Sequence, residues 1–183
     1  MCELFYSALD IALIIADMNP GYQEEVRLLD LIWKNEKARL VMKYRENQRK
    51  FILDIYYWLH YLFDKAVLDK EFDAMQIDLA HLNRTVQPEQ LTGDFSGLGL
   101  FFKSTRIQIL YGSGRSYVRI KLRTLLKQYG YKRRSSSLLQ YIRGCMLFYN
   151  LEVALRNGIP CSIETVGLDR MLTFRLSSRI SSS

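Results

Sequence analysis

The sequence predicts an α+β chain that is mainly helical, with a helical bundle in its first half and a small mixed domain of helices and strands in its second half. Apolar residues recur at helical spacing through residues 2–83, which is typical of packed amphipathic helices. After residue 106 the pattern changes to short alternating runs, which are typical of strands. Residues 85–99 are polar and rich in glycine, and they indicate a linker.

These patterns divide the chain into three expected parts: a helical domain at residues 1–92, a basic domain at residues 93–176 and a disordered tail at residues 177–183. In the first part, helices are predicted at residues 2–18, 23–44, 51–63 and 72–83, with a turn at 19–21 and a polar break at 45–50. Tyr and Trp residues gather around residues 56–61 beyond what a small core needs. This half is therefore a candidate for self-association as a homodimer or for docking a protein partner.

Positive charge is concentrated in the second half of the chain. The whole chain has a net charge of +7, but residues 95–183 carry fifteen Lys or Arg against three acids, a net charge of +12. The first 94 residues therefore carry a net charge of −5. Residues 95–151 hold eleven basic residues and no acid. Excluding acids keeps the potential positive over a whole surface, which favours a polyanion and above all nucleic acid as the partner.

The second half is expected to begin with a β-hairpin. Ile107, Ile109 and Tyr111 alternate with other side chains, and residues 118–122 alternate again. A glycine-rich turn at residues 112–114 lies between the two runs. Alternating runs on both sides of such a turn are a hairpin signal.

Two helices and a closing hairpin are expected to follow. A short helix is predicted at residues 122–129, where Gly130 can end it in a left-handed conformation. A longer helix is predicted after it, capped by Ser135 or Ser136. The last elements are a turn at residues 157–160 and a strand at residues 171–176.

Residues 120–135 and 166–176 resemble a winged helix-turn-helix module of the kind found in bacterial proteins beside regulatory or defence-related domains. The resemblance rests on a leucine-rich helix followed by Gly130, an aromatic residue and Arg133-Arg134, and on Asp169 shortly before a closing strand. It implies nucleic-acid binding, with the second helix in the major groove and its N-terminal residues at the base edges. Double-stranded DNA is favoured over RNA as the ligand.

The start of the second helix combines cations and hydroxyl groups where a helix already attracts anions through its dipole and its free N–H groups. The candidate contacts along this helix are Lys132, Arg133, Arg134, Ser135, Ser136, Ser137, Gln140 and Arg143. The candidate phosphate contacts elsewhere are Arg115, Arg119, Lys121, Arg123 and Lys127.

Enzyme chemistry is not expected from this sequence. The three cysteines lack paired spacing, and the two histidines are distant from them, so neither a disulfide framework nor a zinc site is predicted. No nucleophile, metalloprotease or phosphate-loop motif is present. The carboxylate pairs Glu24/Glu25 and Asp73/Asp78 are of a kind that helix surfaces carry routinely. We expect no catalytic residue, no metal and no cofactor.

A membrane role is not expected either. No apolar run is long enough for a membrane-spanning helix, and Glu3 stands where a signal peptide needs a basic start. A cytoplasmic location is therefore predicted. Two functions stay open: a nucleic-acid-binding protein, or a protein-interaction module or inhibitor. In the second case the basic face binds an acidic protein surface or a nucleic-acid-processing complex.

Overall fold

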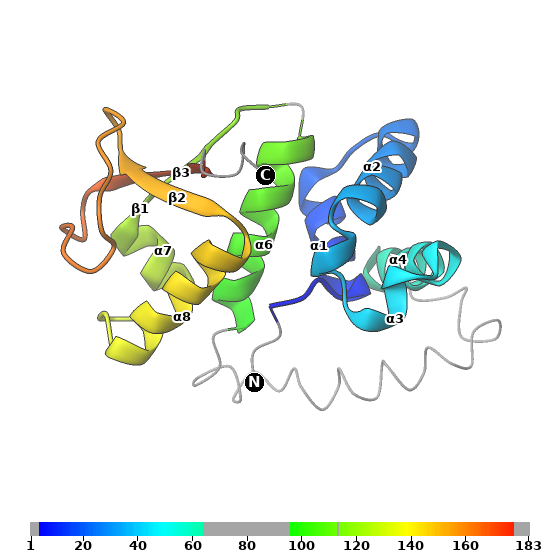
Figure 1. Cartoon of the computed structure of the whole chain (residues 1–183), viewed down its shortest axis with the longest axis horizontal. Coiled ribbons are helices and arrows are strands. Elements are labelled where there is room, and N and C mark those ends of the chain that lie inside the picture. The colour runs from blue at the N-terminus through cyan, green and yellow to red at the C-terminus, as the bar shows by residue number, and fades with distance from the viewer. Residues whose placement is uncertain (1–3, 64–95, 113, 178–183) are drawn as a thin grey trace. The chain divides into compact units, whose positions relative to one another are not determined.

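The computed structural model describes residues 4–63, 96–112 and 114–177. The chain divides into two compact units between residues 93 and 94. The front unit, drawn from blue to cyan in Figure 1, is helical, and the back unit, drawn from green to red, combines helices with a three-stranded sheet. The prediction of a mainly helical α+β chain is confirmed.

The first helix of the front unit, α1 (Ala8–Met18), is bounded by clear signals at both ends. Ser7 and Asp10 form a reciprocal capping box, and Asn19 ends the helix in a left-handed conformation with φ 46°. The predicted helix over residues 2–18 therefore begins later than expected. The reason is a tertiary contact, because the backbone of Tyr6 pairs with that of Leu40 in an isolated β-bridge.

The predicted helix over residues 23–44 is also broken. The structure has α2 (Tyr22–Asn35), a 3-10 turn η1 (Lys37–Arg39) and a short helix α3 (Met42–Arg45). Packing causes the break, because the bridge to Tyr6 holds the Leu40 backbone extended and the Trp33 indole donates a 2.9 Å hydrogen bond to the Tyr44 carbonyl.

The last described helix of the front unit is α4 (Gln48–Phe63), which packs mainly against α1. The predicted polar break at 45–50 is shorter than expected, because Asn47 accepts a 2.9 Å bond from the Lys50 N–H at the start of α4. Core side chains come from all of these helices, and Tyr44, Phe51 and Ile55 are buried. The Tyr44 hydroxyl donates a 2.7 Å bond to the buried carboxylate of Asp54. The predicted helix at 72–83 and the Asp73/Asp78 pair lie outside the described residues.

The back unit begins with α6 (Ser96–Tyr111), which corrects two predictions. Residues 96–99 are helical rather than linker, and residues 106–111 are helical rather than the first strand of a hairpin. Gly97 and Gly99 serve close packing, because a Cβ at Gly97 would lie 3.0 Å from the Tyr129 ring and one at Gly99 would overlap the Tyr141 hydroxyl. The helix contacts both β3 and α8, so its apolar residues do not form a single helical stripe.

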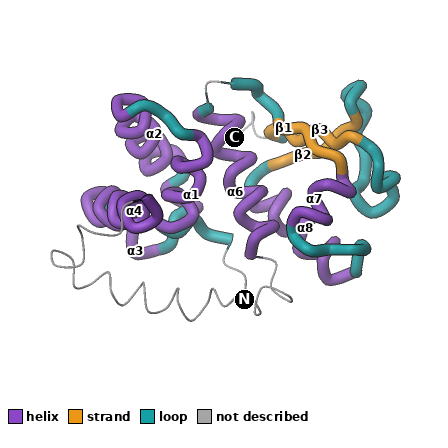
Figure 2. Tube along the Cα trace, turned by 180° about the vertical axis from the view of Figure 1, so that it is seen from behind, coloured by secondary structure: helices purple, strands orange, loops and turns teal. Residues whose placement is uncertain are grey.

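The three strands form an antiparallel sheet in the order β1-β3-β2. They are β1 (Val118–Lys121), β2 (Leu151–Leu155) and β3 (Met171–Leu176). Phe174 on β3 is buried against Phe101 and Phe102 of α6, with ring centroids 5.6 and 5.8 Å apart. One face of the sheet is therefore covered by helices, and Figure 2 shows the strands beside α7 and α8. The strand predicted at 171–176 is confirmed.

Helices α7 (Leu122–Gln128) and α8 (Ser136–Phe148) lie where the sequence predicts them. Gly130 adopts φ 80° after α7, a conformation that costs little only for glycine. Ser135 caps α8 by accepting a 3.2 Å bond from the Leu138 N–H.

The connection from β2 to β3, here called the β2–β3 loop (residues 156–170), is tied down at several points. It turns at Gly158, with φ 83°, where the Leu155 N–H donates to the Ile159 carbonyl at 2.8 Å. At its far end the N–H of Arg123 donates to the carbonyl of Leu168 at 2.7 Å. After β3, the Ser177 N–H donates to the Asn150 carbonyl at 2.8 Å, so this first residue of the predicted tail is bonded to the back unit. The other residues of the predicted tail, 178–183, lie outside the described part.

Candidate nucleic-acid interface

Most of the predicted contact residues lie on two different surfaces of the back unit. One is the helix edge, formed by Lys132 and Arg133 in the turn before α8 and by the exposed side of α8. The other is the sheet face, which is the side of the sheet away from the helices and carries Arg119 and Lys121. Lys127 is exposed on α7.

The exposed side of α8 is continuous along the helix. Leu138, Ile142 and Cys145 point into the core, so the opposite side faces solvent. The exposed residues on that side are Ser136, Ser137, Gln140, Arg143 and Leu147. No acid occurs in α8. The helix therefore offers hydroxyl, amide and guanidinium groups without a repelling charge.

Lys132 and Arg133 are exposed immediately before this helix, and neither makes an ion pair with another residue of the described part. Ser135, predicted as a contact, is used differently. Its hydroxyl caps the helix and lies 3.1 Å from the Ser137 hydroxyl. The cap organises the first turn, where backbone N–H groups lack partners within the helix.

Arg134 does not join the exposed edge in the way its position in the basic run suggests. Its side chain is half-buried, and Nη1 donates 2.7 Å hydrogen bonds to the carbonyl oxygens of Ile163 and Val166. The guanidinium group thus holds the β2–β3 loop beside the start of α8. A run of three basic residues gives no local signal that the third one turns inward.

Two other predicted contacts are paired with acids of the β2–β3 loop. Arg123 makes a two-point contact with Asp169, with distances of 2.6 and 2.8 Å, and Arg143 pairs with Glu164. The hydrogen bond from Arg123 lowers the pKa of Asp169 and raises that of Arg123. Both arginines remain more than half exposed, so they are held in place while part of their charge is neutralised.

Part of the acid-free basic stretch is not on the surface at all. Lys103 and Arg106 on α6 are buried, with 6% and 8% of their surface exposed. Arg106 donates a 2.8 Å bond to the Tyr149 carbonyl at the C-terminal end of α8, where a cation complements the helix dipole. The outward-facing positive surface is therefore smaller than the sequence count suggests.

The sheet face is set by strand alternation. Val118 and Ile120 lie opposite the buried Phe174 and Leu172, so Arg119 and Lys121 point the other way. The Arg119 guanidinium donates to the Thr173 hydroxyl at 3.3 Å.

An aromatic residue interrupts the basic residues before β1. The carbon of the Arg119 guanidinium lies 4.4 Å from the centre of the Tyr117 ring, and that of Arg115 lies 5.8 Å from it. Tyr117 was not among the predicted contacts. The sequence already contained a signal for this contact, because Tyr117 is two residues from Arg115 and two residues from Arg119.

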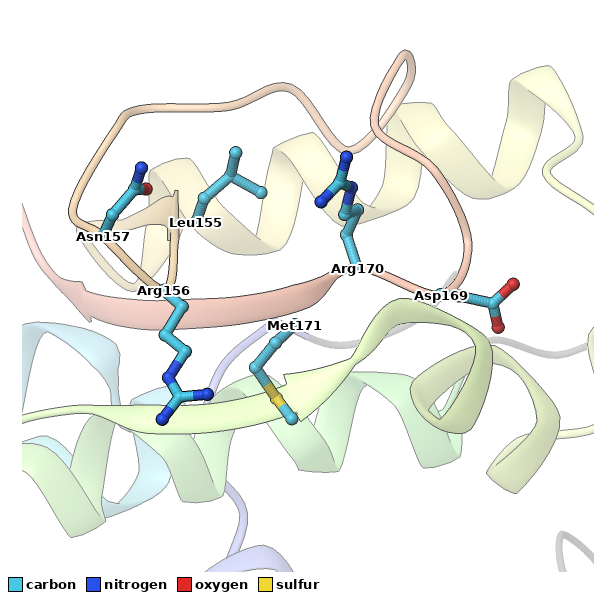
Figure 3. Close-up of a pocket in the computed structure, with 6 residues that line it drawn as sticks. All are labelled: Leu155, Arg156, Asn157, Asp169, Arg170 and Met171. Carbon is cyan, nitrogen blue, oxygen red and sulfur yellow. The ribbon is translucent and has the colours of Figure 1, made fainter.

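Two further arginines lie at the end of the sheet beside the β2–β3 loop. Arg156 and Arg170 line an open pocket of about 580 Å³ together with Asn157, Asp169 and Met171. Arg156 and Met171 extend to one side of this pocket, and Arg170 to the other (Figure 3). Neither arginine was among the predicted contacts, because both lie outside the acid-free stretch.

A hollow in the front unit has a different character. It measures about 490 Å³, lies among α1, α2 and α4, and has no Lys or Arg in its lining. Burial, and then the negative charge of Glu25, raise the pKa of Tyr56 there. Glu24 instead pairs with Arg27 at 3.1 Å, so the two adjacent glutamates have separate partners.

The described residues contain neither a cluster of potential metal ligands nor a helix suited to crossing a membrane. In residues 4–63, 96–112 and 114–177 no three His, Cys, Asp or Glu side chains gather closely enough to hold a metal ion. Within the same ranges, no helix has both the length and the apolar character needed to cross a membrane. Cys145 is buried, and burial raises the pKa of the half-buried Cys161 thiol.

Comparison with known proteins adds no assignment to this geometry. No family model matches the chain, and no match is found among curated proteins or solved structures.

Proposed function

We propose that the back unit is a winged helix-turn-helix module that binds double-stranded DNA through the helix edge. The observation that carries this proposal is the exposed, acid-free side of α8, which directly follows the exposed cations Lys132 and Arg133. Thirteen helical residues span about 20 Å, and a major groove about 12 Å wide admits one α-helix.

The order of elements supports the same proposal. A helix, a strand, two helices joined by a glycine turn, and two strands joined by the β2–β3 loop follow one another from Ser96 to Leu176. In such a module the second helix of the pair enters the groove, and the loop between the last strands acts as the wing. Arg134 supports this arrangement because it links the start of α8 to that loop.

Five exposed polar groups of the helix edge have roles in this proposal. Lys132 and Arg133 bind phosphates at the groove edge, and Ser136 and Gln140 reach base edges. Gln pairs well with the N6 and N7 positions of adenine, and a good pair of this kind is worth about 1–3 kcal/mol of discrimination. Arg143, already held by Glu164, lies one turn further along the helix.

The front unit is proposed to provide self-association or partner docking. Tyr22 and Val26 lie one turn apart on α2 and are 76% and 46% exposed. Exposed apolar side chains next to each other are typical of a contact surface.

A second function is favoured by one observation. Leu147, at the far end of the exposed side of α8, is 78% exposed. An apolar side chain there suits a protein surface better than a phosphate backbone. The alternative is therefore that the basic face binds an acidic protein or blocks a nucleic-acid-processing complex.

The test is fluorescence anisotropy of the full chain with duplex DNA, single-stranded DNA and duplex RNA across a salt series. The variant Lys132→Glu/Arg133→Glu removes two outward cations and spares the buried contacts of Arg134. The control variant Arg27→Glu/Arg49→Glu makes the same charge change on exposed residues of the front unit. We expect the first variant to lose duplex binding and the control to keep it.

The salt dependence provides a second measurement. Replacing the two cations by neutral residues, Lys132→Gln/Arg133→Gln, should lower the slope of log K against log salt by about two. Equal duplex affinity of the helix-edge variant and the control would overturn the proposal. Absence of binding to all three nucleic acids at physiological salt would favour the acidic protein partner.

A further inference from the structure

The sheet face forms a second basic surface that the duplex contact does not use. Arg119 and Lys121 on β1 are exposed, and they project from the side of the sheet opposite Phe174, which packs against α6. In Figure 1 the strands of the back unit lie above, and α7 and α8 lie below them. The sheet face and the helix edge therefore point in different directions from one core.

The charge on the sheet face is only partly compensated. On the outward side of β3 and β2, Arg175 pairs with Glu152, directly opposite in the register. Arg156, the first residue after β2, extends to the same side as Met171 (Figure 3), and Met171 lies opposite Lys121. Three cations, Arg119, Lys121 and Arg156, thus border this surface. Glu152 is the one acid on its strands, and Asp169 at the nearby loop is occupied by Arg123.

An aromatic group lies next to these cations. Tyr117 is half-buried, and its ring is flanked by the Arg119 guanidinium at 4.4 Å and the Arg115 guanidinium at 5.8 Å. Aromatic rings and guanidinium planes are the two surfaces on which unpaired bases stack in proteins. A duplex keeps its bases stacked inside the helix, so it cannot use such a platform.

We propose that the sheet face binds single-stranded nucleic acid. Bases stack on the Arg115–Tyr117–Arg119 cluster, and Arg119, Lys121 and Arg156 hold the phosphates of the same strand. This inference goes beyond the duplex contact of the helix edge and does not depend on it. With both sites occupied, the back unit holds a duplex and an unpaired strand at once, as at the end of a duplex with a single-stranded extension.

The probes are a fluorescent oligothymidylate of about 15 nucleotides, long enough for one small binding surface, and a blunt duplex. Each is titrated with the full chain and with matched variants. Arg119→Glu/Lys121→Glu alters the sheet face, and Lys132→Glu/Arg133→Glu makes the same charge change at the helix edge. We expect the first to lower single-strand affinity at least tenfold with little change for the duplex, and the second to do the reverse.

Tyrosine variants test stacking separately from charge. Tyr117→Ala should weaken oligothymidylate binding about tenfold, whereas Tyr117→Phe keeps the ring and should bind within about twofold of the original chain. If Arg119→Glu/Lys121→Glu fails to fold, the Tyr117 pair still decides the question, because neither change adds charge to a strand. Circular dichroism melting of each variant checks the fold.

Three results overturn the inference: no oligothymidylate binding by the original chain, unchanged binding by Tyr117→Ala, or loss of single-strand binding in the helix-edge variant alone. Failure of the duplex contact gives a different result. In that case the blunt duplex does not bind the original chain, while oligothymidylate still binds and depends on Tyr117.

Discussion

Arg134 donates a 2.7 Å hydrogen bond from Nη1 to the carbonyl oxygen of Val166, 32 residues further along the chain. The same nitrogen bonds the carbonyl of Ile163 at an equal distance. Lys132 and Arg133, its neighbours in the sequence, are exposed. The residues of this short basic run therefore have different roles: Arg134 stabilises the β2–β3 loop, whereas Lys132 and Arg133 face solvent.

Replacing Arg134 by Ala should lower the free energy of unfolding of the back unit by about 2 kcal/mol, because two carbonyl oxygens lose a charged donor. Arg133→Ala, which removes an exposed cation of the same type, should change the stability by less than about 0.5 kcal/mol. Urea denaturation followed by circular dichroism measures both. Equal stability of the two variants would show that the loop does not depend on Arg134.

Removing the acid beside Arg123 should strengthen binding of polyanions. In Asp169→Asn the Arg123 guanidinium loses its ionic partner, so its full charge becomes available to a phosphate. We expect tighter duplex binding and a salt slope steeper by up to about one. Anisotropy titration of this variant beside Arg123→Gln/Asp169→Asn tests the cause, since the double variant should show no gain.

The Arg123–Asp169 pair also predicts a pH dependence. The hydrogen bond from Arg123 lowers the pKa of Asp169 below its ordinary value of 3.8. A lowered folded-state pKa means that the pair contributes fully to the free energy of unfolding when the pH is above about 3.9, the ordinary pKa of Asp in an unfolded chain. This contribution is lost as the pH falls through the lower pKa of the folded state. NMR titration of the Asp169 carboxyl should give a midpoint below 3.8, and Arg123→Gln should raise it. The same midpoint in both proteins would show that Arg123 does not interact with the Asp169 carboxylate.

Two glycines of the back unit should respond to alanine in opposite ways. Gly130 has φ 80°, so Gly130→Ala should cost about 1 kcal/mol although no atom lies within 4 Å of the added Cβ. Gly144 lies inside α8 with equal space around it, so Gly144→Ala should stabilise by about 0.5–1 kcal/mol. Thermal melting of the two variants gives both signs. A stable Gly130→Ala variant would mean that the turn between α7 and α8 differs from the one described.

Gly99→Ala should destabilise the back unit although alanine favours helices. The added Cβ would overlap the Tyr141 hydroxyl, so α6 and α8 must separate or Tyr141 must turn. Overpacking costs about 1–3 kcal/mol and the gain in helix propensity is about 1 kcal/mol, so the net loss is about 1 kcal/mol. Gly144→Ala serves as the control, because it adds the same methyl group to a helix without a close neighbour. An unchanged melting temperature for Gly99→Ala would show that α6 and α8 approach less closely.

Local signals allowed parts of the back unit to be predicted. Ser135 as a cap, Gly130 as a helix end and the strand at residues 171–176 all depend on neighbouring residues, and the structure confirms them. The strand expected at residues 106–111 was wrong, because α6 packs against both β3 and α8 and lacks a one-sided apolar pattern. The glycines at residues 97 and 99 wrongly indicated a linker. Their role in a helix depends on the close approach of Tyr129 and Tyr141, which are distant in the sequence.

The sequence by itself determined the mainly helical α+β class, the concentration of positive charge after residue 94 and the two helices that meet at Gly130. These properties follow from composition and from interactions between residues close in the chain. Only the tertiary structure decided which cations face solvent and which have partners within the fold. Arg106 is buried, Arg134 supports a loop and Arg123 is paired with Asp169, because their partners lie between 29 and 46 residues away in the sequence. Long-range contacts of this kind leave no local pattern, and here they separate the basic residues into a helix edge and a sheet face.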